Sequence, residues 1–549
     1  MKNYEIKKIQ KINHNKSLGD CKKNLISEEY CFGISDDSGN VFGFITVPEL
    51  ERALKFDIST MPVGIITTLA EYKNINPESI TEKEADELLK TSLNKGLLIG
   101  KNQKEITHIL LKNTVCGLKQ DFNLENQFNE SFSENIKKAL KLCSSVADRF
   151  SIPIYLIGGG VRDIILNKKC FDIDITVQGN AIEFCKKLVE EYPEIAVLKE
   201  IHDDFKTAKI IFQFGNEKVD IDFASTRKEY YKTPASLPVI EEIECDVCDD
   251  IDRRDFTINS MAISLNEKTF CKLIDPQNGY EDLKNRIIRI MHPVSFVDDP
   301  TRIIRALKFA VRFDCQIEKA TKYLLEECIN SGLFNNIGTE RVKSEIKQTF
   351  GLNSEKAFDE FVKERLYLLI SENIEEIKDK LPEGAFIKSK IKEYEGFLED
   401  KRHIWLVYLG CLISNLCFKD VSEICTKLNL TGQETKTMLD SRELISQKDF
   451  IKNARTNFEI YEILKNYPTE AMIIALIDMQ NEEIEEKIKL YLTQLRHVVI
   501  KTSGKDLIQK GISPGPVFGE FLREILKARL NGIISEEEEA KYLEKIIQK

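Results

Sequence analysis

The stretch YLIGGGVRDIILNKKCFDIDITV, residues 155–177, decides the fold of the chain's central part. It begins with an apolar run, continues through Gly158 to Gly160 into a short apolar segment, and ends with Asp172 and Asp174 among apolar residues. This order is typical of a strand, a glycine turn, a short helix and a second strand. Because strand side chains alternate between faces, Asp172 and Asp174 are expected to point the same way. Adjacent carboxylates repel each other, and a divalent cation between them would remove that cost.

The glycine turn is a candidate phosphate site. A glycine backbone allows a phosphate to approach N–H groups closely at the start of a helix, and Gly159 stands in this turn. Arg162 follows in the first helical turn and can add charge-assisted hydrogen bonds to a phosphate. Since the turn reads GGGVRD, it is neither a Walker sequence nor GxGxxG, and glycines alone equally fit a tight strand-to-helix connection.

A second pair of acidic residues strengthens the metal hypothesis. The segment VDIDFAS, residues 219–225, contains Asp220 and Asp222, again two positions apart between apolar residues. Metal-assisted nucleotidyl transfer requires carboxylates beside the triphosphate, with a third one from a neighbouring strand. One pair alone would equally fit a solvated strand edge, but two pairs favour a metal site. The sequence leaves open which of Asp220 and Asp222 supplies the third carboxylate.

Two basic segments follow. In DDIDRRDFTINSMA, residues 249–262, Arg253 and Arg254 can divide their roles, one facing a triphosphate and the other pairing with a carboxylate. In VDDPTRIIRALKFAVRF, residues 297–313, the early proline predicts a helix with Asp299 as its N-cap. Basic residues then recur every three positions along one face, opposite an apolar face. Such a helix can hydrogen-bond a base edge, or it can simply be a solvated charged face; its basic residues are Arg302, Arg305 and Lys308.

The composition is that of a globular protein with several domains. The chain has 549 residues, a formal charge of −11, 42% hydrophobic and 31% charged residues, which predicts about two to four domains. No apolar run reaches the roughly 18 residues of a membrane span, and no apolar signal core follows the N-terminus, so a cytoplasmic location is expected. The 14 cysteines are scattered, and Cys245 and Cys248 form a CxxC without a second pair, so reduced thiols are expected.

The domain organisation is predicted from changes in pattern along the chain. Residues 1 to about 40 carry few helix or strand signals, whereas residues 41–115 alternate strands and helices and resemble a degenerate CBS domain. Ser133 precedes an amphipathic segment and predicts an N-capped helix. From residue 281 onward, helical periodicity prevails. The expected parts are an N-terminal CBS-like module (1–120), a linker (121–133), an α/β head (134–275), a neck (276–350) and a helical body and tail (351–549).

Together these segments resemble the class II CCA-adding enzyme and bacterial poly(A) polymerase family, whose head is polymerase-beta-like. The matching sequences, in the family's order, are IGGGVRD with DID, RRDFTIN, DPQNGYEDLKNRIIR, VDDPTRIIRALKFA and TERVKSE (339–345). The resemblance implies an α+β protein with a small nucleotidyltransferase head followed by a helical neck, body and tail. It covers about residues 135–350 strongly and residues 501–526 more weakly.

The resemblance also implies roles for individual residues. Asp172 and Asp174 would ligate Mg²⁺, with Asp222 as the third catalytic carboxylate. Gly159 and Arg162 would contact nucleotide phosphates, and Arg254 the triphosphate or ribose. Asp299 and Arg302 would select C or A through the base edge, and Arg305 and Lys308 would continue that face. The family usually has arginine at position 308, glutamate at position 298 and alanine at position 160; the lysine keeps the charge but loses the planar fork.

The implied activity is template-independent addition of C, A or both, from CTP and ATP, to the 3′ end of tRNA, whose acceptor arm the helical parts would hold. A CC-adding or A-adding specialist and a poly(A) polymerase share the same core, and the sequence does not choose among them. An inactive RNA-binding protein is the alternative from another class, and the intact Asp172 and Asp174 argue against it. The sequence is silent on the oligomeric state and on any ligand of residues 1–120.

Overall fold

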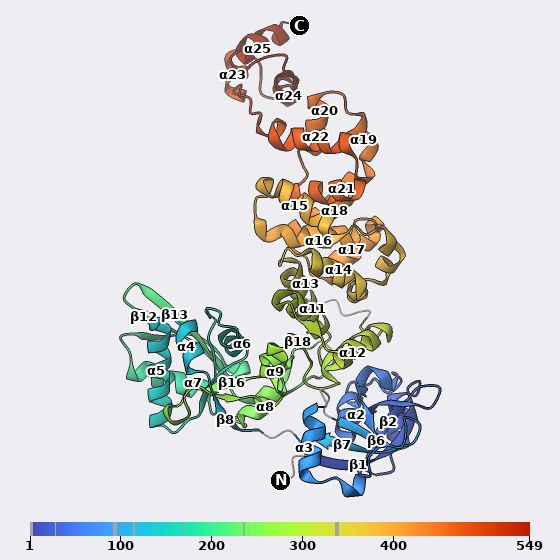
Figure 1. The fold of residues 1–549 in the computed structure, drawn as a ribbon. Helices are drawn as coiled ribbons and strands as arrows, with labels where there is room; N and C mark the ends of the chain where they lie inside the picture. The colour runs from blue at the N-terminus through green and yellow to red at the C-terminus, as the bar shows by residue number, and fades with distance from the viewer. Residues whose placement is uncertain are drawn as a thin grey trace. The chain divides into compact units, whose positions relative to one another are not determined.

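The computed structural model describes residues 4–27, 29–91, 96–113, 116–170, 172–233, 236–334 and 340–548. The chain divides into two compact units, residues 1–334 and 335–549. The first unit holds the N-terminal module, the head and the helices expected in the first part of the neck, and the second unit is helical (Figure 1). The expected α+β fold class is therefore confirmed. Within the part of the chain that the structure describes, no helix is both long and apolar enough to span a membrane.

The N-terminal module is a mixed sheet with helices α1 (Leu18–Lys23), α2 (Val47–Leu54) and α3 (Glu82–Thr91). Its strands lie in the order β4, β3, β2, β1, β7, β6 and β5. The sheet encloses a core that includes Phe44 and Leu98. The strand bounds are Tyr4–Asn13 (β1), Tyr30–Ser35 (β2), Val41–Ile45 (β3), Thr68–Leu69 (β4), Tyr72–Lys73 (β5), Gly96–Gly100 (β6) and Ile106–Lys112 (β7). The resemblance of this module to a CBS domain stays a prediction.

The sparse signals predicted for residues 1–40 are misleading, because β1, α1 and β2 lie there. Strand β1 pairs in parallel with β2 and antiparallel with β7, so it lies inside the sheet. Its isoleucines, Ile6, Ile9 and Ile12, are three residues apart and separated by polar side chains, which hides the alternation typical of a strand. Pairing with distant strands makes this segment a strand.

The head is built on one sheet with the strand order β11, β12, β13, β10, β9, β16, β17 and β8. Strand β10 pairs in parallel with β13 and antiparallel with β9, so it lies between them. The bounds are Leu118–Asn123 (β8), Ile154–Ile157 (β9), Asp174–Val177 (β10), Ala196–His202 (β11), Thr207–Phe214 (β12), Glu217–Ser225 (β13), Ala262–Ser264 (β16) and Lys272–Ile274 (β17). A hairpin of β14 (Arg227–Tyr230) and β15 (Val239–Ile243) follows β13.

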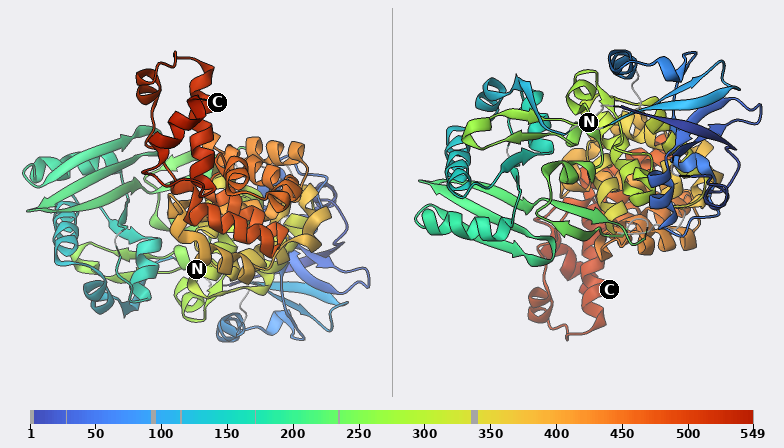
Figure 2. Two further views of the ribbon diagram at one scale, coloured as in Figure 1. Left: turned by 90° about the horizontal axis from the view of Figure 1, so that it is seen from above. Right: turned by 90° about the horizontal axis from the view of Figure 1, so that it is seen from below.

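Helices α5 (Glu134–Arg149) and α7 (Ala181–Glu191) pack on this sheet, as Figure 2 shows from two further directions. The predicted N-cap of α5 is confirmed, because the Ser133 side chain accepts a hydrogen bond from the backbone N–H of Ile136. The glycine turn leads from β9 into α6 (Gly159–Ile165).

The predicted linker at residues 121–133 is wrong. Strand β8 forms the edge of the head sheet by pairing with β17, and α4 (Glu125–Ser131) follows it. Phe128 of α4 is buried, with its ring centroid 5.2 Å from that of Phe270. The segment is polar because an edge strand and a short surface helix need few apolar residues. The partner strand of β8 lies about 150 residues further along the chain. The head therefore begins near residue 118.

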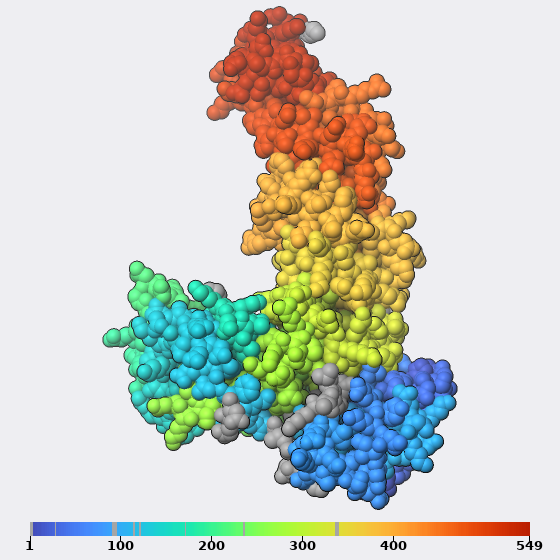
Figure 3. Space-filling model, in the orientation of Figure 1, coloured from blue at the N-terminus to red at the C-terminus, as the bar shows by residue number. Residues whose placement is uncertain are grey.

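Four helices follow the head, and α12 among them packs against the N-terminal module. They are α9 (Gly279–Lys284), α10 (Ser295–Asp298), α11 (Thr301–Phe313) and α12 (Lys319–Asn330). Helix α12 packs against the 3₁₀ helix Val63–Ile66 of the module and against β4. In the space-filling view of Figure 3, the blue atoms of the module lie against the yellow-green atoms of this region.

The second unit consists of packed helices. Its centre includes α16 (Ile404–Ile413) and α21 (Thr469–Met479), which are apolar almost all round and contact each other. A Cβ at Gly410 would lie 2.3 Å from Ile474, so only glycine allows this close approach. The other α-helices are Glu340–Phe350 (α13), Glu355–Lys363 (α14), Gly384–Tyr394 (α15), Phe418–Lys427 (α17), Gly432–Ser446 (α18), Lys448–Asn453 (α19), Asn457–Leu464 (α20), Glu482–Thr493 (α22), Gly504–Gln509 (α23), Pro516–Leu530 (α24) and Glu539–Ile547 (α25).

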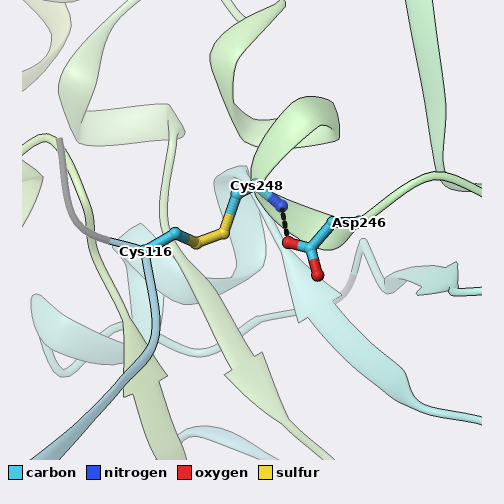
Figure 4. A group of neighbouring side chains, drawn as sticks. All are labelled: Cys116, Asp246 and Cys248. Carbon is cyan, nitrogen blue, oxygen red and sulfur yellow. Dashed lines mark hydrogen bonds between the residues drawn. A yellow bond between two sulfur atoms is a disulfide. The ribbon is translucent and has the colours of Figure 1, made fainter. Parts of the chain in front are cut away.

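One pair of cysteines departs from the expected reduced thiols. Cys116, just before β8, is joined to Cys248 in α8 (Val247–Asp252) by a disulfide with a Cα–Cα distance of 6.2 Å (Figure 4). The Asp246 side chain accepts a hydrogen bond from the backbone N–H of Cys248 at 2.9 Å. Cys245, the other member of the CxxC, is a buried free thiol. The partner of Cys248 lies 132 residues away in sequence, so spacing alone could not reveal it.

Candidate active site

The predicted carboxylates meet at the edge where β10 begins. Asp174, the first residue of β10, lies directly across from Asp222 in the parallel register of β10 and β13. The backbone N–H of Asp222 donates to the carbonyl of Ile173 at 3.0 Å, which fixes this register. One carboxylate oxygen from each of Asp172, Asp174 and Asp222 lies within 4.8 Å of the others. Among the described residues, the structure thus groups Asp222, and not Asp220, with the first two carboxylates.

The electrostatics of this acidic group fit a bound cation. Loss of solvation, followed by the negative charge of Asp172, raises the pKa of Asp174 to about 6, although the residue is solvent-accessible. Lys209 of β12 offsets part of the charge, with its Nζ 3.0 Å from an Asp222 carboxylate oxygen. Clustered carboxylate oxygens are the donors that hard divalent cations prefer. The three side chains therefore form an acidic group that can hold a divalent metal ion.

The glycine turn lies against two arginines, Arg254 and Arg162. Gly158 has φ +72°, a left-handed conformation that favours glycine. A Cβ at this position would lie 2.7 Å from Nη1 of Arg254, so the same glycine also makes room for that guanidinium. A Cβ at Gly159 would lie 3.4 Å from Nη2 of Arg162. The backbone of the turn is therefore flanked by both predicted phosphate-binding arginines.

The two adjacent arginines do divide their contacts. Arg254 contacts Asp250 at 3.3 Å, and its buried Nε has no hydrogen-bond partner among the residues that the structure describes. Arg253 is paired with Asp250 at 2.9 Å and with Glu229 at 3.2 Å. Burial opposes ionisation of Asp250, but the guanidinium groups of Arg253 and Arg254 outweigh it and hold the pKa of this carboxyl below its usual range. Arg253 is thus held by carboxylates, whereas Arg254 keeps unsatisfied donor capacity next to the glycine turn.

A chain of polar contacts connects α6 to α11. Arg162 donates from Nη1 to Oδ1 of Asn259 at 2.7 Å, and its guanidinium lies 4.4 Å from the ring centroid of Phe313. Asn259 donates to Asp255 at 3.1 Å, and Asp255 accepts from Nε of Arg305 at 2.9 Å. Arg162 is 5% exposed, so its guanidinium is largely engaged by protein groups. Its contact with phosphates stays a prediction, and so does base binding by Arg305.

Helix α11 differs from its predicted form in two respects. It begins at Thr301 with Pro300 as N-cap, so the expected cap at Asp299 is wrong by one position, although Asp299 does accept a hydrogen bond from the backbone N–H of Thr301 at 3.1 Å. The alternative of a solvated charged face is also wrong for Arg302 and Lys308, which are 4% and 5% exposed. Arg305 is less covered, with 31% of its side chain exposed.

Arg302 is held by groups from three different segments. It donates to the hydroxyl of Ser295 at 2.6 Å, to the hydroxyl of Tyr231 at 3.2 Å and to the carbonyl of Arg253 at 3.1 Å. Sequence reasoning missed Asp255, Asn259, Ser295 and Tyr231 as site residues. The block RRDFTIN contains the first two, and nothing in the sequence pattern distinguishes Tyr231 or Ser295.

Comparisons with known proteins agree with this geometry. A family model described as the poly A polymerase head domain matches residues 154–289. A solved structure described as a tRNA-processing enzyme in an apo form is 31% identical, with a TM-score of 0.56, and the match covers 73% of this chain and 99% of that one. The chain belongs to the family of tRNA nucleotidyltransferases and poly(A) polymerases.

Two further relatives in this family are informative. The A-adding tRNA nucleotidyltransferase of Aquifex aeolicus is 33% identical over 69% of this chain. The CCA-adding enzyme of Thermotoga maritima, solved in complex with tRNA, is 28% identical, with a TM-score of 0.61, over 78% of this chain and 98% of that one. The chain spans 45% of the length of the Aquifex relative.

Proposed function

We propose that this chain is a template-independent nucleotidyltransferase that adds C, A or both from CTP and ATP to the 3′ end of tRNA. The observation that carries the proposal is the acidic group of Asp172, Asp174 and Asp222, held in register by β10 and β13 beside the glycine turn. The tRNA-bound relative and the A-adding relatives support the choice of substrate. The cytoplasmic location expected from the sequence stays a prediction.

In this reaction, the 3′-hydroxyl oxygen of the RNA attacks the α-phosphorus of the nucleotide, and pyrophosphate leaves as the bond to the bridging oxygen breaks. Asp172 and Asp174, with Asp222, would hold Mg²⁺, which supplies neutralisation of the triphosphate and activation of the hydroxyl. Arg254 is the guanidinium best placed to contact the triphosphate, since it lies against Gly158 with a buried, unpartnered Nε.

The residues proposed to recognise the base are Asp299 and Arg302. Both side chains are buried at the start of α11, where water competes little for their hydrogen bonds. The Asp299 carboxylate can accept from a base edge, and the planar Arg302 guanidinium can donate to it. Arg305 and Lys308 follow Arg302 along the same helix. The A-adding relatives at 33% and 31% identity favour addition of the terminal A as the specific form of the activity.

The test is an extension assay with purified protein, Mg²⁺ and tRNA transcripts that end at the discriminator base, at C or at CC. CTP and ATP are offered separately and together, and products are separated at single-nucleotide resolution. Three additions to the shortest transcript identify a CCA-adding enzyme, two a CC-adding enzyme, and extension of only the CC-ended transcript an A-adding enzyme. A long A ladder on any RNA would replace the proposal with poly(A) synthesis, and no addition would favour an inactive RNA-binding protein.

A further inference from the structure

The N-terminal module is anchored to the helices that follow the head. Val63, Ile65 and Ile66 of the module are fully buried. The Sγ of Cys328 in α12 lies 3.8 Å from the carbonyl oxygen of Ile65, and the ring of Tyr323 in the same helix meets that of Phe42 edge to face. Apolar burial of this kind fixes the module against the neck helices, so polar contacts nearby are held in a defined geometry.

At this contact, α2 of the module sends an arginine to a buried carboxylate. Nε of Arg52 lies 3.3 Å and Nη2 lies 2.5 Å from the two carboxylate oxygens of Asp298, a two-point contact. The Asp298 side chain is 1% exposed, whereas that of Arg52 is 40% exposed. His292 also lies near Asp298, at 3.4 Å, and it carries charge only when protonated. Among the described ion pairs of Asp298, Arg52 is therefore the partner that is always charged.

Asp298 directly precedes the residues proposed to recognise the base. Asp299 follows it in sequence, and Arg302 lies one helical turn further on. Burial disfavours the charged form of Arg302, but Tyr231, Asp299 and Asp298 together raise its pKa, so the charge of Asp298 acts on this guanidinium. The same carboxylate is thus within the electrostatic reach of both Arg52 and Arg302.

A cavity of about 260 Å³ lies beside Arg52 and Asp298. Its lining includes Arg52 and Lys55 of α2, Tyr231, which is a hydrogen-bond partner of Arg302, and Asp298. Without the Arg52 guanidinium, Asp298 would lose the cation that contacts both of its carboxylate oxygens. A buried carboxylate that loses its partner attracts the nearest remaining cation or takes up a proton. Because Arg302 is close by, its contacts with Ser295 and Tyr231 would compete with Asp298.

We propose that Arg52 is a positioning residue for nucleotide selection, which neutralises Asp298 and so keeps Arg302 on Ser295 and Tyr231 beside Asp299. This inference rests on the proposed function, since it gives Asp299 and Arg302 the role of reading the base. The proposal gives the N-terminal module a part in nucleotide selection. This part does not require the module to bind a ligand of its own.

The test measures CTP and ATP separately for wild type, Arg52→Ala, Arg52→Lys and the double variant Arg52→Ala/Asp298→Asn. Binding of each nucleotide in the presence of Mg²⁺ is measured by calorimetry without RNA, and KM and kcat are measured with the transcript that wild type extends. Lys55→Ala is the matched control, because Lys55 ends the same helix and lines the same cavity but makes no contact with Asp298 among the described interactions. Melting temperatures are recorded for every variant.

We expect Arg52→Ala to change the CTP/ATP preference roughly tenfold, mainly through KM, as is typical of coupling between sites. Arg52→Lys should show a smaller change, and the double variant should return towards wild type because no buried charge is left unpaired. An unchanged CTP/ATP preference in Arg52→Ala would overturn the proposal, whether or not the melting temperature falls. A double variant whose preference is no closer to wild type than that of Arg52→Ala would overturn it too. Failure of the proposed function would instead appear as absence of addition by wild type.

Discussion

Two groups of acidic side chains in the head differ in how their charge is balanced. Asp250 and Asp255 are buried and paired with arginines, at 2.9 Å from Arg253 and 2.9 Å from Arg305 respectively. One carboxylate oxygen from each of Asp172, Asp174 and Asp222 lies within 4.8 Å of the others, and Lys209 lies 3.0 Å from Asp222. The positive charge of Arg254 also acts on Asp174. Paired carboxylates hold the protein together, whereas a group with excess negative charge is held ready for an external cation. The difference separates structural acids from those proposed to act in catalysis, without reference to any relative.

The largest expected effect comes from removing a carboxylate of the second group. Asp174→Ala should lower the rate of nucleotide addition by at least about a thousandfold, because the metal that stabilises the developing charge loses a ligand. Binding of tRNA, measured by gel shift, should change little. Asp220→Ala is the matched control, since Asp220 lies on β13, the strand of Asp222, but outside the group. Equal losses of activity and tRNA binding in Asp174→Ala would show that this acid is structural after all.

A smaller effect is expected at the glycine turn, where Gly158 lies against Arg254. Gly158→Ala places a Cβ 2.7 Å from Arg254 Nη1 at φ +72°, so it should cost about 1–2 kcal/mol of stability. It should also raise the KM for nucleotide by displacing Arg254. Gly160→Ala should be nearly neutral, because its Cβ would meet neighbours at 3.5 Å or more. Stability and KM are measured by denaturant unfolding and steady-state kinetics, and similar behaviour of the two variants would refute the steric account of Gly158.

The smallest effect concerns pH and metal. Since the pKa of Asp174 is about 6 in the folded protein, above its ordinary value, the folded protein binds this proton more tightly than the unfolded chain does. This proton adds to the free energy of unfolding at low pH, and that contribution is lost as the pH rises through about 6. Mg²⁺ should therefore raise the melting temperature by a few degrees at pH 7.5 and by less at pH 5. Asp174→Asn should remove this pH dependence, and an Mg²⁺ effect that grows towards pH 5 would contradict the assignment.

Arg302 and Lys308 show where periodicity misleads. Their spacing predicts a basic face on α11, and the helix does form over those residues. Periodicity describes only the helix itself. It cannot reveal that Tyr231 and Ser295, which lie in other segments, contact Arg302. The prediction of a linker around β8 failed for a related reason. An edge strand with few apolar residues becomes recognisable only beside its partner strand β17.

The sequence by itself determined the glycine turn, the aspartate pairs, the Ser133 cap and the helical character of the C-terminal part, because each follows from neighbouring residues and the preferences of the backbone. The tertiary structure alone decided that Asp222 rather than Asp220 joins the acidic group, since that depends on the register between β10 and β13. It also decided that β1 lies inside a sheet and that Arg52 neutralises Asp298. These features require partners that are not neighbours in the sequence, up to 246 residues apart for Arg52 and Asp298. Loss of water at such contacts sets their energies only after the chain has folded.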